Sequence, residues 1–119
     1  MLDISHIVKL YRNGLDLYVK KFHNLGFKGE FDPSQLAIFI YSFNLESDYD
    51  RDITILHEFI HARNDILYDR WDRDDNVEKE AICAYNKSQS ILTFIKELYN
   101  LKDYFNRQTF HATDCQNPC

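Results

Sequence analysis

Two histidines and a glutamate near the middle of the chain have the types and spacing of a metal site. His57, Glu58 and His61 form the pattern His-Glu-x-x-His inside the segment Ile53 to Tyr68. This segment has no Pro or Gly and carries apolar residues at almost every turn, which predicts a helix. Residues four apart share a helix face, so both imidazoles can bind one zinc ion, with Glu58 as general base toward its water. The simpler alternative is an amphipathic helix with polar residues at its edge.

A catalytic zinc site needs a third protein ligand, because two histidines leave it incomplete. Glu78 and Glu80 both lie near the start of a helix predicted over residues 77 to about 100. Residues two apart point to different faces of a helix, so only one of them can face inward. We expect Glu80, which follows His61 after eighteen residues. Alternatively, both acids are there only because the helix dipole favours them.

The arrangement His57-Glu58-x-x-His61-(x18)-Glu80 resembles the gluzincin clan of zinc metallopeptidases over roughly residues 53 to 85. The short chain is similar to the minigluzincins, and Glu80-Ala-x-x-Ala-Tyr85 is similar to the ImmA/IrrE-like peptidases. The resemblance implies a gluzincin-like endopeptidase with His57, His61 and Glu80 as zinc ligands and Glu58 as general base. It also implies a peptide or protein substrate that pairs with an edge strand formed by residues 36–43.

Two positions depart from the family pattern. Arg63 stands where metallopeptidases usually carry a hydrophobic residue after the second histidine. Ala84 stands where thermolysin-like enzymes have an aspartate that supports a histidine ligand. We therefore expect that support to come from elsewhere in the chain.

The residue that would stabilise the transition state is left open by the sequence. The candidates with a polar hydrogen are Tyr85, Tyr99, Tyr104, Arg107 and His111. Tyr85 lies next to the expected ligand on its helix and is our catalytic candidate beside Glu58. A tyrosine packed in the core is the alternative.

The last ten residues suggest either a flexible or an inhibitory tail. His111, Cys115 and Cys119 are spaced by four. Because a cysteine thiolate is a strong zinc ligand, one hypothesis is that the tail fills the open zinc position and keeps activity weak or latent. A frayed terminus is the simpler interpretation.

The remaining elements predict a minimal zincin-like α+β domain that spans residues 1–119. We expect a helix from Asp3 or Ser5 to about His23, then a weak strand at residues 27–31 and a second strand at residues 35–43. The two helices described above complete the domain. The charged segment 69–76 lacks the register of an EF-hand loop, so we interpret it as a solvated loop.

Composition limits the classes of protein that this chain can belong to. It has 119 residues, enough for one domain, and a net charge of −5 without a basic stripe, which argues against nucleic acid as partner. It shows no signal peptide and no apolar run that could cross a bilayer, so we expect a cytoplasmic protein. The three cysteines do not predict a disulfide framework, and Cys83 is interpreted as a small packed residue. The alternative function is a non-proteolytic binding or regulatory module on the same scaffold, which would not need Glu58.

Overall fold

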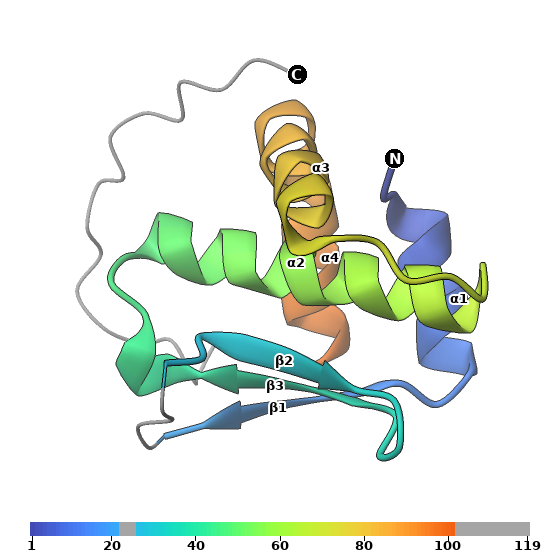
Figure 1. Ribbon diagram of the computed structural model, residues 1–119. Coiled ribbons are helices and arrows are strands. Elements are labelled where there is room, and N and C mark those ends of the chain that lie inside the picture. The colour runs from blue at the N-terminus through green and yellow to red at the C-terminus, as the bar shows by residue number, and fades with distance from the viewer. Residues whose placement is uncertain (22–25, 102–119) are drawn as a thin grey trace.

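The structure is a computed structural model in which residues 1–21 and 26–101 are described. A three-stranded sheet lies against a long central helix, and further helices cover the other sides of that helix (Figure 1). The described helices are α1 (Ile4–Arg12), α2 (Asp48–Ile66), α3 (Asp74–Lys87) and α4 (Gln89–Leu98), with a short 3-10 turn at Ser42–Asn44. The expected α+β class is confirmed.

The sheet combines one parallel and one antiparallel pairing. Its strands are β1 (Asp16–Lys20), β2 (Gly29–Asp32) and β3 (Ala37–Tyr41), in the spatial order β1-β3-β2. β3 pairs parallel with β1 and antiparallel with β2. The two strands expected at 27–31 and 35–43 are therefore present. The second is the buried centre of the sheet, however, so the expectation that it forms the peptide-pairing edge is wrong.

The first predicted helix is correct only in its first half. α1 begins after the Asp3 cap and ends at Arg12, and Gly14 follows with a positive φ of 94°. Glycine adopts this left-handed conformation without steric cost and commonly ends a helix there. Residues Asp16–Lys20 extend and pair with β3 instead of continuing the helix. Tyr18 and Val19 favour a strand, and tertiary pairing outweighs the helical spacing of the apolar residues.

The last predicted helix is divided in two. α3 ends at Lys87 and α4 begins at Gln89, because Ser88 is extended with φ −152° and ψ 103°. α4 can then turn its apolar side, with Ile91, Leu92 and Ile95, into the core. On α3, Cys83 is half-buried and disulfide-bonded, which differs from the unpaired packed thiol that we expected.

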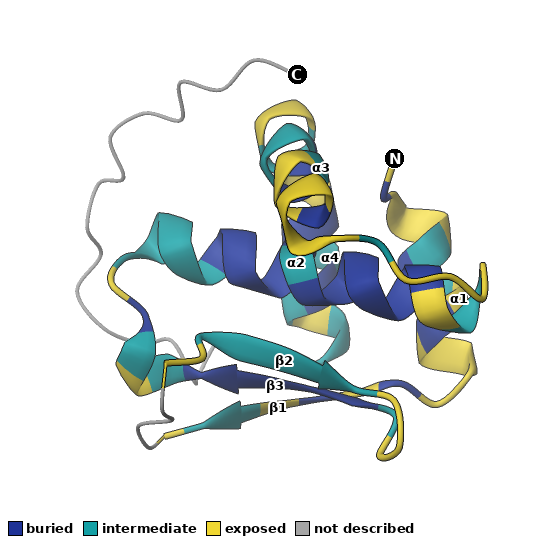
Figure 2. Ribbon diagram, in the orientation of Figure 1, coloured by how far each residue is buried: buried dark blue, intermediate teal, exposed yellow. Residues whose placement is uncertain are grey.

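Helix α2 is the centre of the molecule. Ser47 caps it by accepting a hydrogen bond from the Asp50 amide, and Asp48 and Asp50 complement the dipole of its first turn. Figure 2 shows this helix as mostly buried between the sheet and α3. Its buried members include polar residues as well as apolar ones, and those polar groups need partners because burial removes water from them. The buried polar residues of α2 are Asp52, Thr54, Glu58, His61, Arg63 and Asn64.

Candidate metal centre

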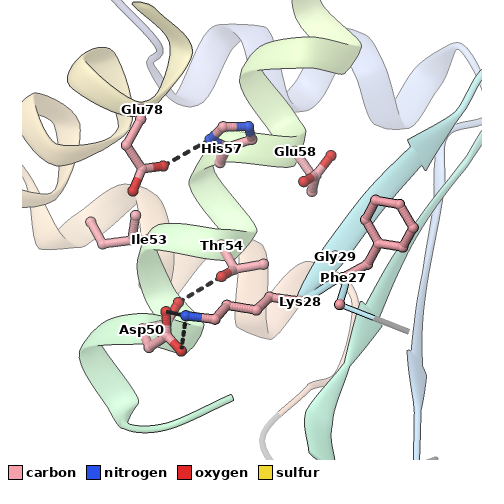
Figure 3. A pocket seen from close by; sticks show the side chains of 10 residues that line it. Phe27, Lys28, Gly29, Asp50, Ile53, Thr54, His57, Glu58 and Glu78 are labelled. Atoms are coloured by element: carbon pink, nitrogen blue, oxygen red, sulfur yellow. Dashed lines mark hydrogen bonds and ion pairs between the residues drawn. The ribbon is translucent and has the colours of Figure 1, made fainter. Parts of the chain in front are cut away.

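His57 and His61 lie one turn apart on the same side of α2. Their ring centroids are 4.8 Å apart with an interplanar angle of 65°. His61 is buried, and His57 lies at the wall of a hollow that Figure 3 shows between α2, α3 and the sheet. The expected adjacency of the two imidazoles is therefore present in the structure.

The acid that joins the two histidines is Asp74, the first residue of α3. Its Oδ1 atom lies 2.8 Å from His61 Nε2 and 3.5 Å from His57 Nε2. One donor atom from each of the three residues lies within 4.8 Å of the other two, and no other group of three metal-binding side chains this close occurs in the described part of the chain. Two imidazoles and a carboxylate are a donor set that suits zinc and related divalent ions.

Glu78 holds the other nitrogen of His57. His57 Nδ1 and Glu78 Oε1 are 2.8 Å apart, and Figure 3 shows the carboxylate pointing at the ring. If Nδ1 donates its hydrogen to this carboxylate, the lone pair of Nε2 is free to bind a metal. This is the common carboxylate–histidine–metal arrangement, which fixes both tautomer and orientation. Glu78 is thus placed where it could give a His57 ligand the support that Ala84 cannot.

The two histidines differ in how easily they take up a proton. Burial favours neutral His57, but its hydrogen bond to Glu78 and the nearby carboxylates outweigh burial and raise its pKa. Burial dominates for His61 and lowers its pKa despite the hydrogen bond to Asp74. The hydrogen bond from His61 in turn lowers the pKa of Asp74, which keeps that carboxylate ionised. A metal ligand must be a neutral imidazole or an ionised carboxylate, and the lowered pKa values of His61 and Asp74 favour these forms. To bind a metal through Nε2, the His61 ring must carry its hydrogen on Nδ1 instead of donating it from Nε2 to Asp74.

Glu58 is buried beside the two histidines. Burial raises its pKa to about 7, with nearby Asp74, Glu30 and Glu78 adding to the effect and His57 opposing it. A carboxyl group with this pKa can both accept and release a proton near neutral pH, as a general base and acid must.

The sheet reaches Glu58 through Gly29 on β2. A Cβ atom at this position would lie 2.8 Å from Thr54 Cγ2 and 3.3 Å from Glu58 Cγ. Only glycine allows the strand to pack this closely against α2. The residue that we interpreted as a weakness of the strand thus brings β2 to the site.

Glu80 is not at the site. Whereas Glu78 contacts His57 of α2, Glu80 forms a two-pronged ion pair with Arg63 of the same helix, whose Nη2 lies 2.9 Å from Glu80 Oε1. The backbone N–H of Leu2 also donates to Glu80, at 2.7 Å. Arg63 is only 2% exposed, so its charge requires a partner. The prediction of Glu80 as third ligand therefore does not fit this geometry. The sequence contained a sign of the ion pair, because Arg63 stands at a position where metallopeptidases usually carry a hydrophobic residue.

Tyr85 also lies away from the candidate metal centre. Its ring packs edge-on against Tyr49, with centroids 5.0 Å apart. Tyr49 lies in the first turn of α2, about 12 Å from His57 along the helix axis at 1.5 Å per residue. The structure does not bring Tyr85 to the histidines, and its packing fits the core alternative. Of the other donor candidates, Tyr99 bonds to the Leu15 carbonyl at 2.7 Å.

The segment between α2 and α3 contributes more than a solvated loop. Trp71 stacks on His61 with centroids 4.4 Å apart and an angle of 12°. Buried Asn64 donates to Asp72 at 3.0 Å and accepts the Arg70 amide on its backbone carbonyl at 2.9 Å. These contacts fix the segment just before Asp74. The sequence analysis did not predict these contacts, although a tryptophan among aspartates is unusual for a solvated loop and indicates a packed side chain.

Several expectations concern residues outside the described part of the chain. They are the roles of Tyr104, Arg107 and His111, and the inhibitory tail at residues 110–119 with Cys115 and Cys119. Among the described helices, none is both long and apolar enough to cross a membrane.

Comparisons with known proteins find no match: no family model, no curated protein and no solved structure is similar enough to this chain to assign it to a family.

Proposed function

We propose that this chain is a metal-dependent hydrolase of peptide bonds, with zinc as the expected ion. The observation that carries the proposal is the cluster of His57 Nε2, His61 Nε2 and Asp74 Oδ1 beside a buried glutamate. His57, His61 and Asp74 would hold the ion, and Glu78 would orient His57. When bound, zinc supplies a Lewis acid that polarises a carbonyl group and makes water more acidic.

Glu58 is the proton carrier of the proposed reaction. It would take the proton from the attacking water and give it to the nitrogen of the leaving amine. Its burial beside His57, one of the residues that would hold the ion, places the carboxylate next to the position of the attacking water. A binding module would have no need for a buried acid beside the metal, so Glu58 favours the hydrolase over the regulatory alternative.

The position of β2 supports a peptide as substrate. β2 pairs with β3 on one side only, so within the described sheet it is an edge strand, and its Gly29 borders the hollow that contains Glu58. An edge strand can bind an extended peptide through backbone hydrogen bonds. Such a peptide would run past Glu58 and the histidines, which replaces the expectation that residues 36–43 provide this edge.

Cleavage of an unstructured protein or a mixed peptide library by zinc-loaded protein tests the proposal. We expect turnover that disappears on treatment with a chelator and returns with zinc. Glu58→Gln should bind zinc normally but lose about 100-fold or more of the cleavage rate, the usual effect of removing a general base. A matched change at an exposed acid on α4, Glu97→Gln, should leave the rate unchanged. Equal cleavage by Glu58→Gln and wild type, or no cleavage by either, would contradict the proposed reaction.

A further inference from the structure

Trp71 is an exposed aromatic ring held directly over a candidate metal ligand. One face of its indole stacks on His61, yet the residue remains 69% exposed. The loop beneath it is held by the contacts of Asn64 with Asp72 and Arg70. A large apolar surface that is exposed but fixed in place is typical of a binding surface.

Two hollows share Glu58 in their walls, one toward the start of α2 and the other toward His61. The first, here called the polar hollow, is the one in Figure 3 and is lined by Lys28, Asp50, Thr54, Glu78 and other residues. The second, here called the aromatic hollow, contains Phe27, Phe31, Trp71, His61, Asp74 and Glu30. Both hollows also include Phe27, Gly29, His57 and Glu58 in their walls. A chain that passes Glu58 would therefore place one side chain toward each hollow.

The size of the aromatic hollow limits what it can hold. Its volume is about 270 Å³, and the polar hollow has the same volume. Pockets for whole drug-sized ligands are typically about 300–1,000 Å³. Each hollow therefore fits a single side chain better than a complete small molecule.

We propose that the aromatic hollow is a specificity subsite for a large apolar side chain, preferably aromatic, of the peptide substrate, with Trp71 as the residue that selects it. The proposal rests on the proposed function, because it names the substrate class of the same site. Three aromatic rings surround this hollow, and Trp71 and Phe27 are still 69% and 55% exposed without a ligand. An apolar side chain that entered would cover both.

The charged groups around the two hollows disfavour an acidic substrate side chain. In the polar hollow, Lys28 is already paired with Glu46 and Asp50, at 3.2 Å and 3.1 Å. The aromatic hollow has carboxylates at its edge in Glu30 and Asp74, which disfavour an acidic side chain there. A substrate with a phenylalanine beside the cleaved bond should therefore bind better than one with alanine or aspartate.

The test uses Glu58→Gln, loaded with zinc, so that peptides bind without being cut. The probes are capped alanine-rich hexapeptides that differ at one central position, which is phenylalanine, alanine or aspartate. Calorimetry measures their dissociation constants, and the emission of Trp71 reports directly on the site because the chain has a single tryptophan. We expect the phenylalanine peptide to bind about tenfold or more tighter than the alanine peptide and to shift the emission, since it buries a large apolar side chain.

Variants of the aromatic ring then locate the preference. In the Glu58→Gln background at saturating zinc, Trp71→Ala should remove the preference for phenylalanine, and Trp71→Phe should keep most of it. Tyr18→Ala is the matched control, because Tyr18 is an exposed aromatic residue, 46% accessible, on the opposite edge strand β1. Its preference should equal that of the unmodified background.

Three results would overturn the subsite: a preference that survives in Trp71→Ala, equal affinities for all three peptides, or no peptide binding. Failure of the hydrolase proposal gives a different pattern. In that case, zinc-loaded protein with Glu58 intact leaves the phenylalanine peptide uncut, although the peptide still binds selectively through Trp71. Cleavage without any dependence on Trp71 would reject the subsite alone.

Discussion

The replacement Glu80→Gln separates a structural role for this residue from the ligand role expected from its spacing. In the structure, Glu80 neutralises Arg63 and accepts the Leu2 amide. The Arg63 side chain is 3% exposed and that of Glu80 is 23% exposed. Removing one partner of a buried ion pair typically costs about 3–5 kcal/mol, because the other charge stays buried without compensation.

We expect Glu80→Gln to lower the free energy of unfolding by roughly 2–4 kcal/mol, below the full range because glutamine keeps an acceptor and Glu80 is partly exposed. Urea unfolding of the metal-free protein measures this loss as a shift of the midpoint at constant slope. The matched control is Glu97→Gln, the same change at an exposed residue on α4, which should stay within about 0.5 kcal/mol of wild type.

A second pair of variants tests the cause of the loss. Replacing Arg63 as well, as Arg63→Met with Glu80→Gln, leaves no buried charge, keeps an acceptor for the Leu2 amide and should recover part of the stability that Glu80→Gln alone loses. Zinc content of folded Glu80→Gln should equal that of wild type. Unchanged stability together with lost zinc would refute the reasoning and return Glu80 to the metal.

Three further predictions concern the other contacts of the site. In the metal-free protein, folding raises the pKa of Glu58 from about 4.5 to about 7. Protonated Glu58 is therefore compatible with the folded state below pH 4.5, and stability falls as the buried carboxyl group ionises while the pH rises through 7. Glu58→Gln, which cannot ionise, should therefore raise the free energy of unfolding by up to about 3 kcal/mol at pH 8 and change it little at pH 4. Chemical denaturation at both pH values measures this difference. Gly29→Ala should destabilise by roughly 1–3 kcal/mol, because its Cβ would meet Thr54 at 2.8 Å, and a thermal melt showing wild-type stability would contradict this close packing. Asn64→Leu should weaken zinc affinity by about 10–100-fold, the usual effect of losing a group that supports a ligand, because the contact of Asn64 with Asp72 is lost. Calorimetric titration of the folded variant with zinc measures this affinity. An unchanged affinity would show that the loop does not position Asp74.

The central part of the site was predictable because its information is local. His57, Glu58 and His61 are fixed relative to one another by one helix, so their spacing alone predicts that the imidazoles share a face. The class of fold and two of the strands could be predicted for the same reason, from apolar spacing and turn residues.

The third acid could not be chosen from spacing. Whether Glu78 or Glu80 reaches the histidines depends on the rotation of α3, and Arg63 of α2 fixes that rotation by pairing with Glu80. Asp74 was missed because its sequence neighbours are charged, so the segment resembles a solvated loop. Its position depends instead on the packing of α3 on α2, which pairs His61 with Asp74 and His57 with Glu78.

The first strand shows how two signals can compete in one segment. Apolar residues at helical spacing continue from α1 through Tyr18, and this favoured one long helix. Gly14, with its positive φ, was the better signal because it permits the turn into β1. The parallel partner β3 lies about twenty residues further on, and such long-range pairing is invisible to a local pattern.

Zinc titration of the purified protein tests the central claim most directly. Isothermal calorimetry and metal analysis should be applied to wild type, Asp74→Asn and Glu80→Gln. We predict about one zinc per chain for wild type and Glu80→Gln, the usual content of such a site, and binding that is weakened by more than about 100-fold in Asp74→Asn, beyond the loss from a supporting group. Full zinc binding by Asp74→Asn, or loss of zinc in Glu80→Gln alone, would contradict a metal centre formed by His57, His61 and Asp74.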